Sequence, residues 1–284
     1  MSGPLHTLVS GLGFAEAPRW RDGHLWFVDY FSNSVLRTDF SGPPEKVAVV
    51  EGTPGGLGFL PDGDALVVSQ RTFAIQRIGN GGVLSAYADL GGYARGAANE
   101  MLVDARGRAY VGHHGFDFFG GAELRPSSLL LVEPSGSVRV VAEDVIFPNG
   151  MALSEDGRTL ILAESFAERL TAFDVASDGS LSNRREWAAI PGHTPDGICL
   201  DAEGAVWAAS PLSGAFLRVR EGGEILDRID TTDKRWAVAC VLGGPQRRTL
   251  YCVTAATTLE GMPRGESQAF IETVEAPAPG AGLP

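Results

Sequence analysis

Residues 147–165 read FPNGMALSEDGRTLILAES, and versions of this stretch recur along the whole chain. Two apolar runs, residues 151–153 and 160–163, flank a tight turn at Asp156-Gly157. This pattern predicts a β-hairpin. Asn149 stands at the mouth of the hairpin, just ahead of its first strand.

Five further stretches match this hairpin, the last of them more weakly. They cover residues 18–29, 56–69, 99–112, 195–210 and 239–253. The turn glycines Gly23, Gly63, Gly107, Gly157 and Gly204 are 40, 44, 50 and 47 residues apart. This spacing leaves room for four short strands per unit, and strand-rich repeats of that length are typical of a β-propeller. A doubly wound α/β fold is excluded because long apolar periods of 3.6 residues are missing.

The sequence therefore predicts an all-β, six-bladed β-propeller with four-stranded blades, formed by a single domain over residues 1–284. A propeller must pair its ends, because an open ring would expose edge strands. Residues 5–9 and 269–274 are strand-like and lie outside the six hairpins. We expect these N- and C-terminal strands to share the closing blade, and the proline-rich tail, residues 276–284, to be irregular.

Charge and composition narrow the range of partners. The formal net charge is −12, and nucleic-acid binding requires the clustered Lys and Arg that this chain lacks. The N-terminus has no basic region followed by an apolar stretch, and no window approaches the length of a membrane span. We predict a soluble, cytoplasmic monomer or weak homo-oligomer without a nucleic-acid or membrane partner. Its three cysteines lie in apolar segments and are expected to be buried free thiols.

Polar residues recur at one position of the repeat. The innermost strand of each propeller blade starts at one end of a central channel, so equivalent positions converge there. The converging residues are Glu16, Gly55, Asn99, Asn149, Asp196 and Ala239. Two carboxylates and two amides opposite small residues predict a cation site, and such oxygen donors suit Ca²⁺, with Mg²⁺, Mn²⁺ or Zn²⁺ as alternatives. The competing interpretation is that these residues only cap strand ends or bond to one another in a wet channel.

Four segments form a recognisable set: residues 13–20 (GFAEAPRW), 147–152 (FPNGMA), 195–198 (PDGI) and 242–245 (LGGP). Together they resemble the senescence marker protein (regucalcin), gluconolactonase and luciferin-regenerating enzyme family. The resemblance implies a six-bladed propeller with one divalent metal in the channel, usually hydrolysing a lactone ring. It also implies that Glu16, Asn149 and Asp196 are the metal ligands, with Asn99 near the substrate or a bound water. The chain departs from the family pattern at Glu100, where an aspartate is common.

The resulting prediction is a metal-dependent hydrolase that opens a lactone ring. The divalent metal would polarise the carbonyl group, and Asp196 is the candidate general base. One alternative is a non-catalytic propeller that binds Ca²⁺ or a small ligand. Another is a strictosidine-synthase-like condensing enzyme, which would need a carboxylate placed for an amine substrate.

Further candidates lie near the expected channel rim. His113 and His193 are candidate substrate contacts, although histidines at strand ends are more often structural. Residues 113–124 (HHGFDFFGGAEL) insert three phenylalanines after an inner hairpin, which predicts an apolar lid over the channel mouth. Such a lid would favour a bulkier, more apolar lactone than a small sugar acid. The alternative is a loop packed on the blade edge.

Overall fold

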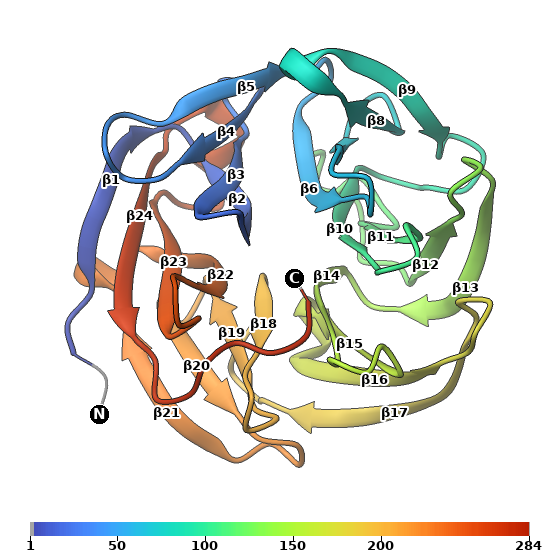
Figure 1. Ribbon diagram of the computed structural model, residues 1–284. Coiled ribbons are helices and arrows are strands. Elements are labelled where there is room, and N and C mark those ends of the chain that lie inside the picture. Colours follow the sequence, from blue (N-terminus) through green and yellow to red (C-terminus); the bar gives the residue numbers. More distant parts are fainter. Residues whose placement is uncertain (1–2, 284) are drawn as a thin grey trace.

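The computed structural model describes residues 3–283 and forms a ring of six four-stranded sheets around a central channel (Figure 1). The predicted six-bladed β-propeller is thus confirmed. Residues 1, 2 and 284 of the predicted domain lie outside the described part of the chain. No helix in that part is long and apolar enough to cross a membrane.

Five blades each take four consecutive strands, ordered outward from the channel. Blade one contains β2 (Ala15–Arg21), β3 (His24–Asp29), β4 (Ser34–Thr38) and β5 (Glu45–Val49). Blade two contains β6 (Pro54–Phe59), β7 (Ala65–Ser69), β8 (Ala74–Ile78) and β9 (Leu84–Asp89). Blade three contains β10 (Ala98–Val103), β11 (Ala109–His113), β12 (Ser127–Val132) and β13 (Val138–Val145). Blade four contains β14 (Pro148–Leu153), β15 (Thr159–Glu164), β16 (Arg169–Val175) and β17 (Leu181–Ala189). Blade five contains β18 (Ile198–Leu200), β19 (Val206–Ser210), β20 (Ala215–Val219) and β21 (Ile225–Asp230).

The sixth blade closes the ring with strands from both ends of the chain. It contains β22 (Trp236–Gly243), β23 (Thr249–Ala256), β24 (Gln268–Glu275) and, outermost, β1 (His6–Leu12). β1 and β24 pair antiparallel, with His6 opposite Thr273. The shared closing blade is therefore confirmed, and the long edge of β24 is covered by β1.

The turn glycines explain why the hairpin repeats with this sequence. Gly23, Gly63, Gly107, Gly157 and Gly204 have φ values of 76°, 104°, 77°, 69° and 76°. Glycine occupies this left-handed region without the steric penalty that a Cβ would impose. Each turn reverses the innermost strand at the same end of the channel, so the opposite end collects the strand starts.

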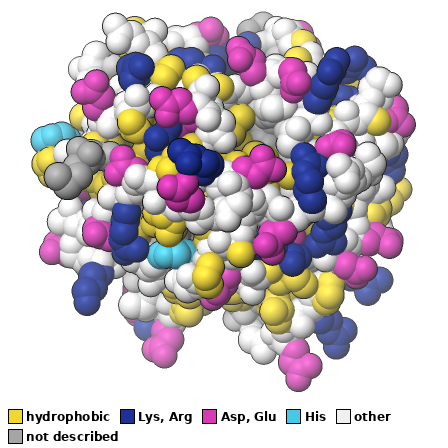
Figure 2. All heavy atoms as spheres, turned by 90° about the horizontal axis from the view of Figure 1, so that it is seen from below, with side chains coloured by type: hydrophobic (Ala, Val, Ile, Leu, Met, Phe, Trp, Pro, Cys, Tyr) yellow, Lys and Arg dark blue, Asp and Glu magenta, His cyan; other side chains and the backbone are white. Residues whose placement is uncertain are grey.

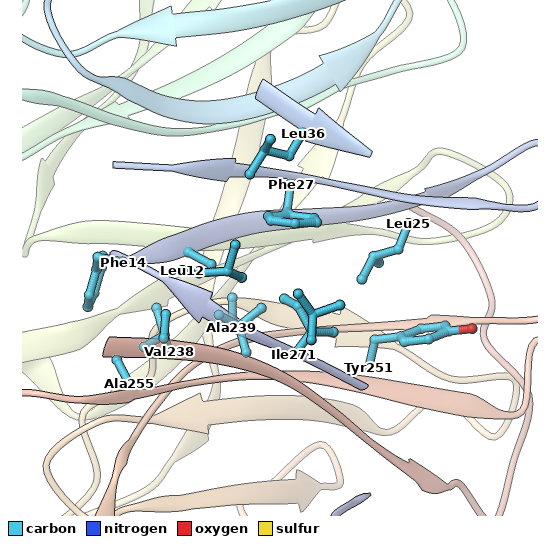
Figure 3. Packing of buried hydrophobic residues seen from close by; sticks show 14 of the residues in the cluster. Leu12, Phe14, Leu25, Phe27, Leu36, Val238, Ala239, Tyr251, Ala255 and Ile271 are labelled. Carbon is cyan, nitrogen blue, oxygen red and sulfur yellow. The ribbon is translucent and has the colours of Figure 1, made fainter. Parts of the chain in front are cut away.

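Apolar side chains pack between neighbouring blades rather than in one central core. Figure 3 shows Phe27 of β3 and Ile271 of β24 in a buried cluster between blades one and six. Trp20 stacks on Tyr251 with ring centroids 5.1 Å apart, and Trp26 meets Phe59 of blade two edge-on at 5.2 Å. These inter-blade contacts hold the ring together. Charged side chains of both signs are interspersed over the side of the ring seen in Figure 2.

The three cysteines are free and buried, as expected. The tail after β24 is irregular, also as expected, yet it is firmly attached at the channel end that carries the turns. Gly280 N donates to Arg247 O at 2.8 Å, and Ala281 N donates to Leu200 O at 3.0 Å. Leu283 forms an antiparallel bridge with Leu153. The tail therefore ties blades six, five and four together on the face opposite the strand starts, and its end lies near the middle of the ring (Figure 1).

Candidate active site

The polar residues of the repeat meet at the channel end where the innermost strands start. Glu16, Asn99 and Asn149 are each the second residue of β2, β10 and β14, and Asp196 stands two residues before β18. These four side chains line one cavity of about 150 Å³. Gly55 holds the matching position in β6, where a Cβ would lie 2.9 Å from the carbonyl oxygen of Asn99. The small residue there is therefore a packing requirement.

Glycines next to the polar residues bring neighbouring blades close together. A Cβ on Gly150 would lie 2.4 Å from Asp196 O, and one on Gly197 would lie 2.4 Å from the Cβ of Ala239. Both distances are shorter than real Cβ contacts, so only glycine allows this approach. Gly150 N donates to Asp196 O at 3.1 Å and Gly197 N to Val238 O at 3.0 Å. The Asn149-Gly150 and Asp196-Gly197 pairs thus place an amide and a carboxylate side by side.

Hydrogen bonds orient the amides of Asn99 and Asn149. These two residues form the cavity floor together with Glu16 and Asp196. Asn99 Nδ2 donates to Asn149 Oδ1 at 3.3 Å, and Asn149 Nδ2 donates to Ser165 Oγ at 3.3 Å. Ser165 Oγ in turn donates to the carbonyl oxygen of Pro195 at 2.7 Å. This series of hydrogen bonds turns the oxygen of Asn149 away from Ser165 and links the site across blades three, four and five.

Glu16 and Asp196 are carboxylates without a cationic partner. Burial, and next the charge of Glu100, raises the pKa of Glu16 to about 8. Burial raises the pKa of Asp196 well above its usual range, followed by the charges of Glu16 and Glu100, while a hydrogen bond from Asn149 opposes the shift. Within residues 3–283, neither carboxylate forms a hydrogen bond or ion pair with a Lys, Arg or His. Both ionised forms would be stabilised by a cation between them.

The donor set fits a hard divalent cation. Two carboxylates and the amide oxygen of Asn149 offer oxygen ligands only, which suits Ca²⁺ with water at the remaining positions. No group of three or more His, Cys, Asp or Glu side chains able to hold a metal occurs in the described residues. The candidate ligand set therefore depends on Asn149 as its third member.

A third carboxylate near the site, that of Glu100, is paired with an arginine. Arg19, on β2, places its NH2 group 2.8 Å from Glu100 Oε1 and 2.7 Å from the carbonyl oxygen of Met101. Arg19 and Glu100 are only 7% and 9% exposed. The Arg19 guanidinium thus pairs with Glu100, whereas Glu16 and Asp196 have no Lys, Arg or His partner within residues 3–283.

The connection from β11 to β12 contributes to the cavity, as its phenylalanines suggested. His114, Phe118 and Phe119 line it together with Phe147 and Phe166. Burial lowers the pKa of His114 to about 4, with a further contribution from His113 that Asp117 opposes. The His114 ring is therefore uncharged at neutral pH and acts as another aromatic face. Whether the connection moves as a lid stays a prediction.

His113 and His193 do not line the cavity. The ring of His113 contacts the backbone of Arg95 and the hydroxyls of Ser127 and Ser128. His193 Nδ1 lies 2.9 Å from Ser213 Oγ on the surface of blade five. Substrate contact by either histidine stays a prediction, because it would require substrate atoms beyond the lining of this cavity.

The position of His113 has a structural explanation. The second strand of several blades ends in a polar residue whose side chain holds a connection near the strand starts. Asp29 of β3 accepts from the N–H groups of Gly13 and Phe14, and Glu164 of β15 accepts from Ile146 N. His113 is the blade-three member of this series. Ser165, which follows Glu164, lines the cavity.

Comparison with known proteins gives a consistent picture. The family described as SMP-30/Gluconolactonase/LRE-like region matches residues 14–256. Regucalcin of Xenopus laevis is 26% identical over 258 residues, covering 86% of this chain and 84% of that protein. The 6-deoxy-6-sulfogluconolactonase of Pseudomonas putida is 26% identical over 253 residues, covering 84% and 82%.

Among solved structures, a luciferin-regenerating enzyme superposes with a TM-score of 0.83 at 19% identity, covering 99% of both chains. At this identity the likeness concerns the fold. The family match, in contrast, spans most of the sequence and includes Glu16, Asn99, Asn149 and Asp196. The chain therefore belongs to the SMP-30/gluconolactonase/LRE-like family.

Proposed function

We propose that this protein hydrolyses lactones at the cavity floor formed by Glu16, Asn99, Asn149 and Asp196. The observation that carries the proposal is the pair of carboxylates, Glu16 and Asp196, which no Lys, Arg or His among the described residues neutralises, beside an oriented amide in an open cavity. A relative named as a lactonase, from Pseudomonas putida, matches the chain along most of its length. The reaction class is carboxylic ester hydrolysis on a small cyclic substrate.

Glu16, Asn149 and Asp196 would hold one divalent cation. Ca²⁺ suits this all-oxygen set best, and Zn²⁺, Mn²⁺ or Mg²⁺ are the alternatives. A bound cation would supply Lewis-acid polarisation of the lactone carbonyl and favour the ionised forms of both carboxylates. Asn99 supports this arrangement because its amide donates to the oxygen of Asn149.

Asp196 is the proposed general base. Its carboxylate lines the cavity, and it would accept a proton from the water that adds to the lactone carbonyl carbon. The ring C–O bond then breaks, and the departing alkoxide takes a proton back, which yields the open hydroxy acid. Asn99 lines the same cavity and would contact the water or the substrate.

A pH-indicator assay over a panel of lactones tests the proposal. We expect turnover that a chelator abolishes and that added Ca²⁺ or another divalent ion restores. Asp196→Asn should lower kcat by about 100-fold or more while the protein stays folded, as expected for loss of a general base. Asp156→Asn is the matched control, because Asp156 is exposed in the β14–β15 turn and does not line the cavity, and it should keep full activity.

The same assay, together with the melting temperature, distinguishes the lactonase from the main alternative function. A non-catalytic propeller that binds Ca²⁺ would show a raised melting temperature with Ca²⁺ and no turnover of any lactone. Full activity of Asp196→Asn would refute the base assignment alone. Activity that persists after complete metal removal would refute the role of the metal.

A further inference from the structure

One wall of the cavity is a continuous set of aromatic rings. The centroids of Phe147 and Phe166 are 4.6 Å apart, Phe118 lies 5.2 Å from Phe147, and His114 stacks on Phe147 at 4.5 Å and 16°. Phe119 extends the set, 5.1 Å from Phe118. The rings come from separate connections of blades three and four, so the wall is a built feature of the rim rather than one chance loop.

The opposite wall is also apolar. Blade five contributes Leu212, blade six contributes Trp236, Leu259 and Met262, and the connection into blade one contributes Phe14. Leu212 and Leu259 are 56% and 54% exposed. Across the mouth, Phe119 and Phe166 are 41% and 37% exposed. Large apolar side chains left open to water around one cavity mouth indicate that an apolar group covers them in use.

The cavity offers few polar groups beyond those already assigned to the floor. No Lys or Arg is among its described lining residues. The Ser165 hydroxyl and the Asn99 amide are held by the bonds given above. Within the described residues Thr194 Oγ1 has no hydrogen-bond partner, but it is fully buried, so it presents no exposed polar atom to a ligand. The hydroxyl groups of a bound ligand would therefore find no hydrogen-bond partners along these walls.

We propose that these walls select lactones with an aromatic or other bulky apolar substituent, and discriminate against polyhydroxylated and anionic sugar lactones. The proposal names the substrate class of the lactone hydrolysis proposed above and rests on it. The lactone ester would lie on the polar floor, and the substituent would lie between the phenylalanines and Leu212 or Leu259. Each hydroxyl of a sugar lactone would instead lose water against an aromatic ring, and an anionic group would find no basic side chain.

The size of the cavity agrees with this assignment. A volume of about 150 Å³ is comparable to apolar protein cavities that hold one benzene-sized molecule. The mouth is open, so a second ring or an alkyl chain can extend over Phe119 and Leu259.

Three lactones that share the same δ-lactone ring and differ in their substituents test the selectivity. We expect kcat/KM to be highest for a phenyl-substituted δ-valerolactone, lower for δ-valerolactone and lowest for D-glucono-δ-lactone. The first and last should differ by about 100-fold or more, as apolar pockets discriminate in that range. Phe118→Ala should reduce the preference for the phenyl compound over δ-valerolactone by roughly 10-fold. Leu259→Ser, at an exposed position on the opposite wall, should act in the same direction without endangering the fold.

Phe31→Ala is the matched control, because Phe31 is an exposed phenylalanine (36%) outside the cavity. It should leave the selectivity unchanged. Equal or better turnover of glucono-δ-lactone would overturn the proposal, as would unchanged selectivity in both wall variants. A change of oligomeric state in Leu259→Ser without a change in selectivity would also overturn it, because the rim would then be a contact between copies.

Binding of the corresponding lactams separates this inference from the proposed hydrolysis. Lactams keep the ring shape but resist hydrolysis, and calorimetry measures their affinity directly. We expect the phenyl lactam to bind at least about 10-fold more tightly than the parent δ-valerolactam, and Phe118→Ala to remove this difference. That result without any lactone turnover would support the proposed selectivity of the walls and refute the proposed hydrolysis. Equal affinities of the two lactams would overturn the proposed selectivity of the walls, whatever the enzyme activity.

Discussion

Replacing Glu16 by Gln should stabilise the metal-free protein at pH 8 and leave its stability at pH 4 almost unchanged. Folding raises the pKa of this carboxyl from 4.5 to about 8, chiefly by burial. Below pH 4.5 the group is protonated in both the folded and the unfolded chain. As the pH rises from 4.5 to 8, only the unfolded chain releases the proton, so the free energy of unfolding decreases over this window. Glutamine does not ionise, so the variant avoids this loss of stability.

The magnitude follows from the size of the shift. The rise from 4.5 to about 8, at about 1.4 kcal/mol per pKa unit, sets an upper bound of about 5 kcal/mol. Water in the open cavity and relaxation around the site reduce this, so we expect about 2–4 kcal/mol at pH 8. In a chain of this size that corresponds to a rise in melting temperature of roughly 5–10 °C.

The assay is thermal or urea unfolding of chelator-treated protein at pH 4, 6 and 8. Glu155→Gln is the matched control, because Glu155 is exposed in the β14–β15 turn, and it should differ from the wild type by less than about 0.5 kcal/mol. Divalent metal should stabilise the wild type at pH 8 and stabilise Glu16→Gln much less, since a ligand is lost. Equal pH profiles for the wild type and Glu16→Gln, or a less stable variant at pH 8, would refute the reasoning.

Three further substitutions or deletions test other parts of the site and the ring. Arg19→Met leaves Glu100 buried without its partner and should cost about 3–5 kcal/mol in urea unfolding, most of which the Arg19→Met/Glu100→Met double variant should recover; equal losses in both would contradict the pairing. Gly150→Ala forces a Cβ to within 2.4 Å of Asp196 O, so we expect a lower melting temperature and at least about 10-fold weaker metal binding; normal affinity by calorimetry would show that the approach is not needed. Removing residues 276–284 should cost about 3–5 kcal/mol from lost hydrogen bonds while KM for lactones stays unchanged, because the tail crosses the far end of the channel; a changed KM would contradict that separation.

The sequence was sufficient to predict the fold because the repeated turn and the alternating strands are local signals. Comparing equivalent positions of the repeat also located Glu16, Asn99 and Asn149, since these three occupy the same register of the innermost strands. Asp196 stands just outside β18, yet its cavity position follows from the same comparison. Where the register is fixed by a repeat, positions far apart in the sequence can be superposed without a structure.

The remaining features depend on contacts that no repeat encodes. His113 looked like a rim residue, but the end of a second strand faces the neighbouring connection, and its ring is held there by Ser127, Ser128 and Arg95. Phe147 and Phe166 join the wall through connections whose paths a strand pattern does not define. The attachment of the tail to three blades likewise depends on contacts between segments far apart in the sequence.

We propose that Glu16, Asn149 and Asp196 together bind a divalent metal that lactone hydrolysis requires. The most direct test is calorimetric titration of Ca²⁺ into the chelator-treated wild type and Asn149→Ala, with lactone turnover measured on the same samples. We predict one Ca²⁺ per chain in the wild type with recovery of turnover, and at least about 10-fold weaker binding with a matching loss of turnover in Asn149→Ala. Equal Ca²⁺ affinity in both proteins, or full turnover in the metal-free wild type, would contradict the account.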